Sequence, residues 1–296
     1  MTAVIHAQGL GKRYGRRWAL TECTLQIPSG RVTGLVGPNG AGKTTLLGLA
    51  VGQLAATTGT IDVLGARPAA DANALARVGF VAQSTPVYAQ LTVGDHLRLG
   101  ARLNPRWDAG LAVERIRRIG LDSAQRAGAL SGGQRAQLAL VLAIAKRPDL
   151  LVLDEPVAAL DPLARREFLQ VLMEAAAEHS VSVVLSSHLV ADLERVCDYL
   201  VVLVASHVRL AGEIDELLAQ HRVLVGPRRD PAALADNLRI VSARHTERQT
   251  SLLVRSPDPV DDPSWTTSEV GLEDMVLAYM SPSADPTAPP ALEVLP

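Results

Sequence analysis

The stretch GPNGAGKTT, residues 37–45, decides the fold because it satisfies the pattern G-x-x-x-x-G-K-[ST] of a loop that wraps a phosphate chain. Glycines accept positive φ angles and let backbone N–H groups close on an anion. The preceding residues 31–36, RVTGLV, predict a buried strand, and residues 43–54, KTTLLGLAVGQL, predict a helix whose N-terminus favours anions. An ordinary turn between a strand and a helix is the competing interpretation, which the Gly-Lys-Thr sequence disfavours. The sequence therefore predicts a site for a nucleoside triphosphate.

Two side chains of this loop have the chemistry that a triphosphate needs. Lys43 is long enough to reach the β- and γ-phosphates, and the Thr44 hydroxyl is a suitable ligand for Mg²⁺. The residues expected to bind the phosphates are Gly37, Pro38, Asn39, Gly40, Ala41, Gly42, Lys43, Thr44 and Thr45.

Two adjacent carboxylates lie in the apolar stretch LLVLDEP, residues 150–156. Open α/β sheets bind ligands at the carboxyl ends of their strands, and both carboxylates are expected at such an end. Asp154 is suited to hold Mg²⁺ through its water shell, and Glu155 is suited to polarise a water molecule for attack on the γ-phosphate. Acidic residues also end solvated strands without a catalytic role, but the phosphate loop makes the functional interpretation the stronger one.

The motif LSGGQ, residues 130–134, precedes a long apolar run. Ser131 and Gln134 fit the S-x-x-Q capping box, so a well-capped buried helix is the simplest interpretation. Two glycines in the first turn, however, cost about 1 kcal/mol each in helix propensity and leave N–H groups uncovered, as a second anion site would. Further along the chain, Asp161 and Pro162 are a good N-cap and N1 pair for another helix.

Two further polar residues end apolar strands. Gln83 follows GFVA and His188 follows VVLSS, so both are expected at the edge of the sheet where ligands bind. Taken alone, each is more often a structural residue than a functional one.

Composition limits the remaining classes of protein. The chain has 296 residues, of which 48% are hydrophobic, and this is enough for one large core with a small appendage. A net charge of −2 argues against nucleic acid as a partner, and the short basic runs 12–17 and 115–118 are interpreted as solvated faces. Cys23 and Cys197 form no C-x-x-C pair, as is usual in a reducing cytoplasm. Because we find neither a signal-peptide pattern nor an apolar run of 18 residues, we expect that the chain does not cross a membrane by itself.

Short apolar strands alternate with helices over residues 1–226, which predicts an α/β fold with a parallel sheet. A mostly helical insertion is expected at about 86–147, and it includes a basic amphipathic helix at 111–119. Residues 227–280 are expected to form a small C-terminal accessory domain, and the Pro-rich residues 281–296 to be disordered. The expected strands are 4–7, 24–27, 31–36, 60–64, 78–82, 150–153, 181–186, 200–204, 239–242 and 251–254, and the expected C-terminal helix is 270–280.

Seven sequence elements in a fixed order give the chain a specific resemblance. Over roughly residues 4–225 it closely resembles the ATP-binding subunits of ABC transporters. The resemblance implies a P-loop NTPase fold with a RecA-like parallel core, an antiparallel β subdomain and a helical subdomain, to which the C-terminal residues add a small α+β extension. The seven elements are Tyr14, GPNGAGKTT, Gln83, LSGGQ, LLVLDEP, AALD ending at Asp161, and His188.

The resemblance also implies a role for each matching residue. Tyr14 would stack on the adenine of ATP. Glu155 would be the catalytic base, and His188 would contact the γ-phosphate and position the attacking water. The residues that the resemblance assigns to catalysis are Lys43, Gln83, Glu155 and His188, and those assigned to Mg²⁺ are Thr44, Gln83 and Asp154.

In that family two subunits pack head to tail, and the resemblance extends this arrangement to the chain. Ser131, Gly133 and Gln134 of one subunit would cap the ATP held by the other, and Asp161 would lie at the seam between them. One residue departs from the family pattern, because Val157 follows DEP where Thr or Ser is common. We expect this position to face the dimer region.

The function implied by the resemblance is ATP hydrolysis coupled to transport. Two MgATP would close a homodimer or heterodimer, hydrolysis would reopen it, and the motion would drive a separate transmembrane permease. The chain most resembles the stand-alone ATPase subunits of bacterial exporters, which are cytoplasmic and held at the inner face of the membrane by the permease. Two alternatives stay open: a soluble ABC protein that acts in translation or DNA repair, and a nucleotide-dependent regulatory module without catalysis.

Overall fold

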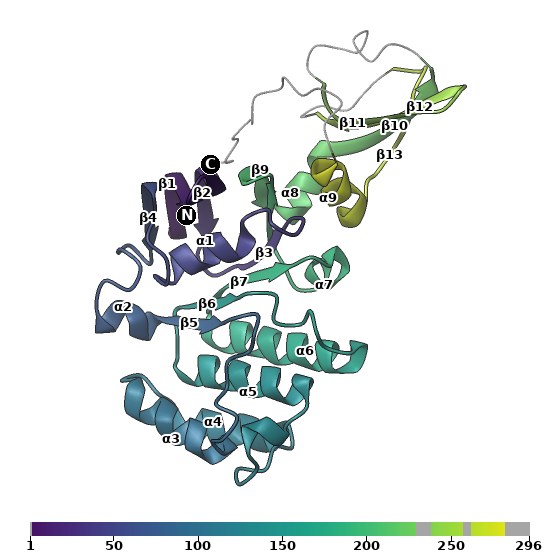
Figure 1. Cartoon of the computed structure of the whole chain (residues 1–296). Helices are drawn as coiled ribbons and strands as arrows, with labels where there is room; N and C mark the ends of the chain where they lie inside the picture. Colours follow the sequence, from purple (N-terminus) through teal and green to yellow (C-terminus); the bar gives the residue numbers. More distant parts are fainter. Residues whose placement is uncertain (1, 229–237, 257–261, 282–296) are drawn as a thin grey trace.

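Three β-sheets and the helices packed against them form the described part of the chain (Figure 1). The computed structural model describes residues 2–228, 238–256 and 262–281. The largest sheet has six strands, and its neighbouring strands run parallel except for β8 and β9. This sheet confirms the predicted parallel α/β core. In the order of the sheet, its strands are β5 (Val78–Val81), β6 (Leu150–Leu153), β7 (Ser182–Ser187), β3 (Val32–Val36), β8 (Tyr199–Val204) and β9 (His207–Glu213).

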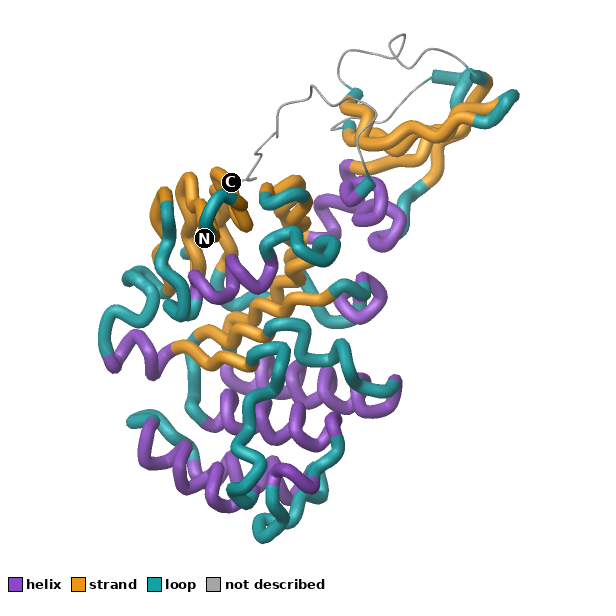
Figure 2. The backbone as a smooth tube through the Cα atoms, in the orientation of Figure 1, coloured by secondary structure: helices purple, strands orange, loops and turns teal. Residues whose placement is uncertain are grey.

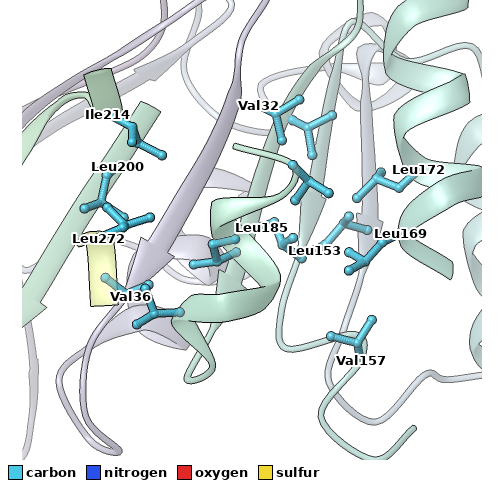
Figure 3. Close-up of a cluster of buried hydrophobic side chains, with 14 of the residues drawn as sticks. Val32, Val36, Leu153, Val157, Leu169, Leu172, Leu185, Leu200, Ile214 and Leu272 are labelled. Atoms are coloured by element: carbon cyan, nitrogen blue, oxygen red, sulfur yellow. The ribbon is translucent and has the colours of Figure 1, made fainter. Parts of the chain in front are cut away.

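The central strands are buried on both faces, which explains their nearly continuous apolar sequences. Successive side chains of a strand point to opposite faces, so Leu151 and Leu153 enter one hydrophobic cluster while Leu150 and Val152 enter another. Figure 3 shows part of the first cluster. Among the described residues, no helix is both long and apolar enough to cross a lipid bilayer. The helices that flank this sheet are α1 (Lys43–Ala50), α2 (Ala72–Arg77), α6 (Pro162–His179) and α7 (Val190–Glu194).

The second sheet is antiparallel, with strands in the order β2-β1-β4. Strands β1 (Ala3–Tyr14) and β2 (Arg17–Pro28) form a long hairpin, and β4 (Thr58–Val63) pairs with the other edge of β1. The strands predicted at 4–7 and 24–27 are much shorter than β1 and β2. The apolar alternation stops at glycines and charged residues, whereas the hydrogen-bonded ladder continues through them.

Residues 86–147, all of which are described, form the helical subdomain of the predicted fold and contain no strand. Each of its helices begins at a residue whose side chain accepts a backbone N–H bond. Thr92 and Asp95 form a capping box, Asp108 accepts from the N–H of Leu111, and Ser131 forms the predicted capping box. The elements are α3 (Val93–Leu103), α4 (Ala109–Arg118), a 3-10 turn (Ala127–Ala129) and α5 (Gly132–Ala145).

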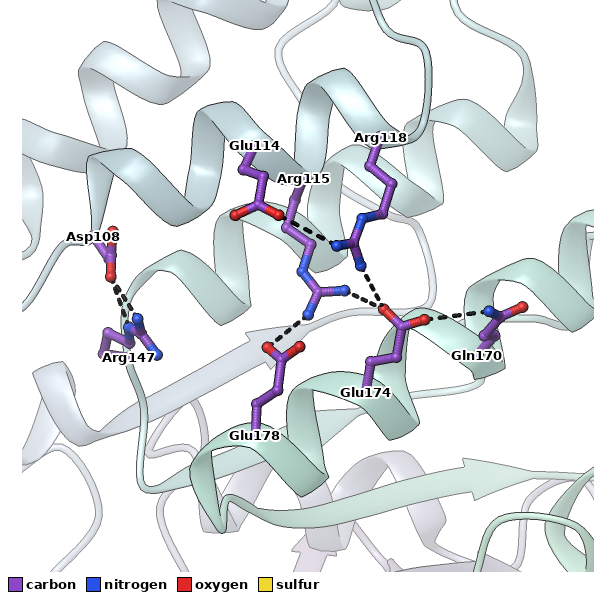
Figure 4. A network of polar contacts seen from close by, with 8 residues as sticks. All are labelled: Asp108, Glu114, Arg115, Arg118, Arg147, Gln170, Glu174 and Glu178. Atoms are coloured by element: carbon purple, nitrogen blue, oxygen red, sulfur yellow. Dashed lines mark hydrogen bonds and ion pairs between the residues drawn. The ribbon is translucent and has the colours of Figure 1, made fainter.

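Arg115 corrects one prediction, because the basic run 115–118 is not simply a solvated face. The Arg115 side chain is only 3% exposed, and its guanidinium donates to Glu174 (2.7 Å) and Glu178 (2.9 Å) of α6. The more exposed Arg118 also reaches Glu174, at 3.0 Å (Figure 4). A buried guanidinium is tolerated where carboxylates neutralise it, and its fork suits two acceptors at once. The helical subdomain is therefore tied to α6 by charge as well as by apolar packing.

The third sheet lies at the C-terminal end of the chain (Figure 2). Its strand β10 (His221–Pro227) pairs with β12 and β13. The predicted boundary between residues 226 and 227 falls within β10, near the end of this strand. Apolar sequence alone does not reveal which strands a strand pairs with. The predicted disordered tail lies, from residue 282 on, outside the described residues. The remaining elements are α8 (Ile214–Gln220), β11 (Arg239–His245), β12 (Gln249–Arg255), β13 (Thr266–Ser268) and α9 (Leu272–Met280).

His221 joins three elements at the start of this sheet. Its imidazole is buried, with Nδ1 2.6 Å from the carbonyl oxygen of Leu217 and Nε2 2.9 Å from the hydroxyl of Tyr279. Because a carbonyl only accepts, Nδ1 donates and Nε2 accepts from Tyr279, which requires the neutral ring. Burial, with a smaller contribution from nearby arginines, lowers the pKa of His221 to about 4. The ring therefore connects α8, β10 and α9 in its neutral form.

We expect acid to weaken the fold through His221. In the unfolded chain the imidazole gains a proton near pH 6.5, but in the folded chain only near pH 4, so stability falls as pH drops between these values. Down to pH 4 the loss amounts to roughly 3 kcal/mol. The measurement is urea unfolding of wild type and His221→Gln at pH 7, 5.5 and 4. Wild type should lose more stability than the variant on acidification, and parallel pH curves would contradict this.

Candidate active site

A groove of about 900 Å³ opens at the carboxyl ends of the core strands. It is formed by the β1–β2 hairpin, the phosphate loop with the start of α1, and the residues that follow β5, β6 and β7. Five different segments of sequence thus meet in one place, and most of the predicted site residues are among them. The lining residues are Tyr14, Arg17, Ala19, Asn39, Gly40, Ala41, Gly42, Lys43, Thr44, Thr45, Gln83, Glu155, Ala158 and His188.

The phosphate loop requires glycine where its backbone meets other backbone. A Cβ atom at Gly37 would collide with the carbonyl oxygen of Leu203 in β8, and one at Gly42 would collide with that of Ala19 in β2. Gly42 also has a φ of 110°, a left-handed value that disfavours any side chain. Gly37 and Pro38 lie outside the lining of the groove, so they shape the loop while the residues after them face the groove.

Lys43 lies at one end of a chain of polar contacts that runs through Glu155 to His188. Its side chain is 5% exposed, and its Nζ donates to the carbonyl oxygen of Gly37 (2.8 Å) and lies 3.2 Å from Oε1 of Glu155. The second oxygen of that carboxylate, Oε2, lies 3.1 Å from Nδ1 of His188. The predicted phosphate-binding lysine, catalytic base and histidine are therefore adjacent.

Glu155 is held in an unusual backbone conformation by a residue that sequence reasoning did not identify. Its φ is 45°, which costs strain for a residue with a side chain. The Glu155 N–H donates to the hydroxyl of Ser186 (2.8 Å), and that hydroxyl donates to the carboxylate of Asp154 (2.8 Å). Ser186 is fully buried at the end of β7. The only sequence signal for it is the polar pair that ends the apolar strand before His188.

Replacing Ser186 by Ala should slow ATP turnover without removing ATP binding. The change leaves the Glu155 N–H and the buried Asp154 carboxylate each without a partner, at a cost of about 1–3 kcal/mol. We expect turnover to fall roughly 10- to 100-fold, because Glu155, the predicted base, loses its fixed position while Lys43 is unaffected. Phosphate release and ATP affinity should be measured on wild type, Ser186→Ala and Ser186→Thr. Rescue by Thr supports a positioning role, and normal turnover of the Ala variant excludes it.

The predicted site residues of the LSGGQ motif, together with Asp161, lie outside the groove of their own chain. Ser131 and Gln134 form the predicted capping box, in which the Ser131 N–H donates to Gln134 Oε1 (2.9 Å) and the Gln134 N–H donates to Ser131 Oγ (3.1 Å). Ser131 is exposed, and Gly133 beside it is half-buried. Asp161 caps α6 by accepting from the N–H groups of Leu163 and Ala164, each at 3.0 Å. The helix-capping predictions are confirmed.

Val157 corrects another expectation. Its side chain is 2% exposed and belongs to the main hydrophobic cluster, as Figure 3 shows. It therefore packs inward and does not face a dimer surface. A valine is suited to this position because a hydroxyl there would have to find a partner inside the core.

The oxygen atoms near the phosphate loop fit Mg²⁺. Thr44 and Gln83 line the groove, while Asp154 lies beneath it with only 2% of its surface exposed. The Asp154 N–H donates to the carbonyl oxygen of Val81 (2.9 Å). This hydrogen bond holds the carboxyl end of β6 beside the carboxyl end of β5. One hydroxyl, one amide and one carboxylate are hard oxygen donors, and Mg²⁺ in nucleotide sites takes few protein ligands in addition to phosphate oxygens.

Comparison with known proteins agrees with this geometry. A family model described as ABC transporter matches residues 20–158. YxlF of Bacillus subtilis, an uncharacterised ABC transporter ATP-binding protein, is 33% identical over 229 residues, which are 75% of this chain and 75% of YxlF. Nod factor export ATP-binding protein I of Burkholderia orbicola is 32% identical and covers 87% of this chain and 88% of its own length.

An import protein and a solved structure are also similar to this chain. Phosphonates import ATP-binding protein PhnC 2 of Pseudomonas aeruginosa is 32% identical over 73% of this chain and 86% of its own length. A solved structure of an ATP-binding subunit of an ABC transporter is 28% identical, with a TM-score of 0.66 over 73% of this chain and 92% of its own. By its sequence and its fold, the chain belongs to the ATP-binding proteins of the ABC transporter family.

Proposed function

We propose that this chain hydrolyses ATP, using the groove at the phosphate loop as its active site. The observation that carries the proposal is the contact chain from Lys43 through Glu155 to His188, with distances of 3.2 and 3.1 Å. These side chains come from three separate segments, and the folded chain brings them to one face of one groove. The groove thus contains Lys43, a cation that can bind phosphates, and Glu155, a carboxylate that can accept a proton from water.

Each residue contributes one physical task. The N–H groups of residues 39–45 and the Lys43 ammonium bind the phosphates, and Tyr14, which lines the groove, stacks on the base. Thr44, Gln83 and Asp154 would hold Mg²⁺, whose positive charge would offset the charge of the β- and γ-phosphates. The Glu155 carboxylate accepts a proton from the attacking water. His188, which is in contact with that carboxylate, orients the water toward the γ-phosphate.

We further propose that the active form is a dimer in which the LSGGQ motif acts on the partner's nucleotide. Ser131 is exposed at the N-terminus of the 14-residue helix α5, away from the groove of its own chain. Gly132 and Gly133 leave the N–H groups of this first turn free of side chains that would cover them. The partner at this surface is a second ATPase subunit, either a copy of this chain or a related one.

A separate membrane permease is the proposed partner in transport, and export is the proposed direction. The match to the Nod factor export protein covers 87% of the chain, whereas the match to the phosphonate import protein covers 73%. The export protein thus resembles this chain over part of its C-terminal extension as well. The location that follows from these proposals is the cytoplasmic face of the membrane, at the permease.

The test is phosphate release by the purified chain, alone and after copurification from membranes with its native partner. We expect MgATP turnover in at least one of these two states, and a multi-span membrane protein in the copurified complex. Absence of turnover in both states would overturn the enzyme proposal. Turnover combined with copurification of ribosomal or DNA-repair proteins would instead favour a soluble, non-transport ABC protein.

A further inference from the structure

The tip of the β1–β2 hairpin presents two side chains to the nucleotide groove. Tyr14 and Arg17 are directly opposite each other in the antiparallel ladder, on either side of the two-residue turn Gly15-Arg16. Directly opposed residues of an antiparallel pair place their side chains on the same face. Both residues line the groove, while Arg16 in the turn does not. The position proposed for adenine stacking therefore has a guanidinium beside it.

The Arg17 side chain reaches from the hairpin to the phosphate loop. A methyl group built on Gly40 would lie 3.8 Å from Nη2 of Arg17. Gly40 has a φ of 80° and belongs to the loop that wraps the phosphates. The guanidinium thus lies beside the space that a side chain at position 40 would occupy, next to the loop, and Arg17 lines the same groove as Glu155 and His188.

The other charges in the groove explain why the Arg17 guanidinium matters for binding a polyphosphate. Lys43 is already close to a carboxylate, because Oε1 of Glu155 lies 3.2 Å from its Nζ, and Asp154 adds a second negative charge nearby. Arg17, in contrast, makes no ion pair with any carboxylate in the part of the chain that is described. The nearby Arg13 is directed elsewhere, with its guanidinium 5.5 Å from the centre of the Trp18 ring. A polyphosphate that enters the groove meets one cation whose charge is not offset.

We propose that Arg17 is a nucleotide-binding residue that contacts the polyphosphate in the same groove as Lys43. The proposal rests on the proposed function, since it assigns one more contact to the same site. A planar guanidinium donates several N–H groups in a fixed fork and pairs with phosphate oxygens bidentately. Arg17 and Tyr14 act together as a clamp on one hairpin, with the ring on the base and the guanidinium on the phosphates.

The experiment measures the affinity of ADP and ATP for wild type, Arg17→Met, Arg17→Lys and Arg16→Met by titration calorimetry. Arg17→Met keeps the apolar stem and removes the charge, and Arg16→Met is its matched control in the same turn. We expect Arg17→Met to weaken ADP and ATP about 5- to 10-fold, Arg17→Lys to weaken them less, and Arg16→Met to bind as wild type does. The affinity of Arg17→Met should also depend less on salt between 50 and 300 mM.

The possible outcomes distinguish the role proposed for Arg17 from the proposed ATPase function. Wild type that binds ATP, together with an Arg17→Met variant that binds like Arg16→Met, overturns the role of Arg17 and leaves the ATPase proposal standing. Failure of wild type to bind ATP overturns both. Arg17 is exposed, so the variants should keep the wild-type thermal midpoint. An affinity loss with an unchanged midpoint and a reduced salt dependence supports the contact.

Discussion

Replacing Glu155 by Gln is expected to reduce ATP turnover by roughly 100- to 10,000-fold while ATP still binds. Gln has the same shape and keeps an oxygen that accepts a hydrogen bond, but it cannot take a proton from water. The lost charge also removes the carboxylate that lies 3.2 Å from Lys43, so that lysine is freer to pair with phosphate. The measurement is phosphate release in steady state together with ATP affinity.

The same variant tests the proposed dimer. If ATP closes two subunits and hydrolysis reopens them, Glu155→Gln should remain dimeric in MgATP, which size-exclusion chromatography with light scattering detects. Glu194→Gln is the matched control, because Glu194 is exposed on α7 and lies outside the groove. Turnover of Glu155→Gln within a factor of three of wild type would exclude Glu155 as the base.

Replacing Lys43 by Met should weaken ATP binding by roughly 100-fold. The change removes a charge-assisted contact to phosphate from a position that is only 5% exposed, where solvent screens charge poorly. Met fills much of the space of the lysine stem, so the loss reports on charge. Calorimetric titration with ATP measures the effect directly.

A second effect of this change must be separated from the first. Without Lys43, the Glu155 carboxylate, 11% exposed, keeps His188 as a partner but loses its nearest cation, and the fold should lose stability. The double variant Lys43→Met, Glu155→Gln removes that unpaired charge and should restore the thermal midpoint without restoring ATP affinity. Recovery of affinity in the double variant would show that Lys43 acts through Glu155 and not on the phosphates.

The parallel core was predictable because its strands carry their own signal. Strands buried on both faces have continuous apolar sequences, and the Gly-rich loop between β3 and α1 sets the order of the chain around them. The C-terminal sheet was only partly predictable. Strand β10 has no regular alternation of buried and exposed residues, and its assignment depends on pairing with β12, which lies more than twenty residues further along the chain.

The site residues also fall into two groups. Those that belong to motifs, such as Lys43 and Glu155, could be predicted to lie together, and their catalytic roles stay predictions. Ser186 and Arg17 belong to no motif: Ser186 contacts the N–H of Glu155, which is distant in sequence, and the hairpin brings Arg17 opposite Tyr14. The burial of Arg115 was missed for the same reason, since Glu174 and Glu178 belong to a different helix.

The C-terminal extension cannot be treated as a removable tail. Leu272 and Met275 of α9 and Leu253 of β12 are buried in the same cluster as Leu193 and Leu200, which belong to the nucleotide-binding core. A chain shortened to end before His221 would expose that apolar surface of α7 and β8 to water. Its solubility should suffer, since apolar patches of this kind promote aggregation. Low solubility of a shortened chain would therefore be explained by this uncovered apolar surface and would not show that the extension has a regulatory role.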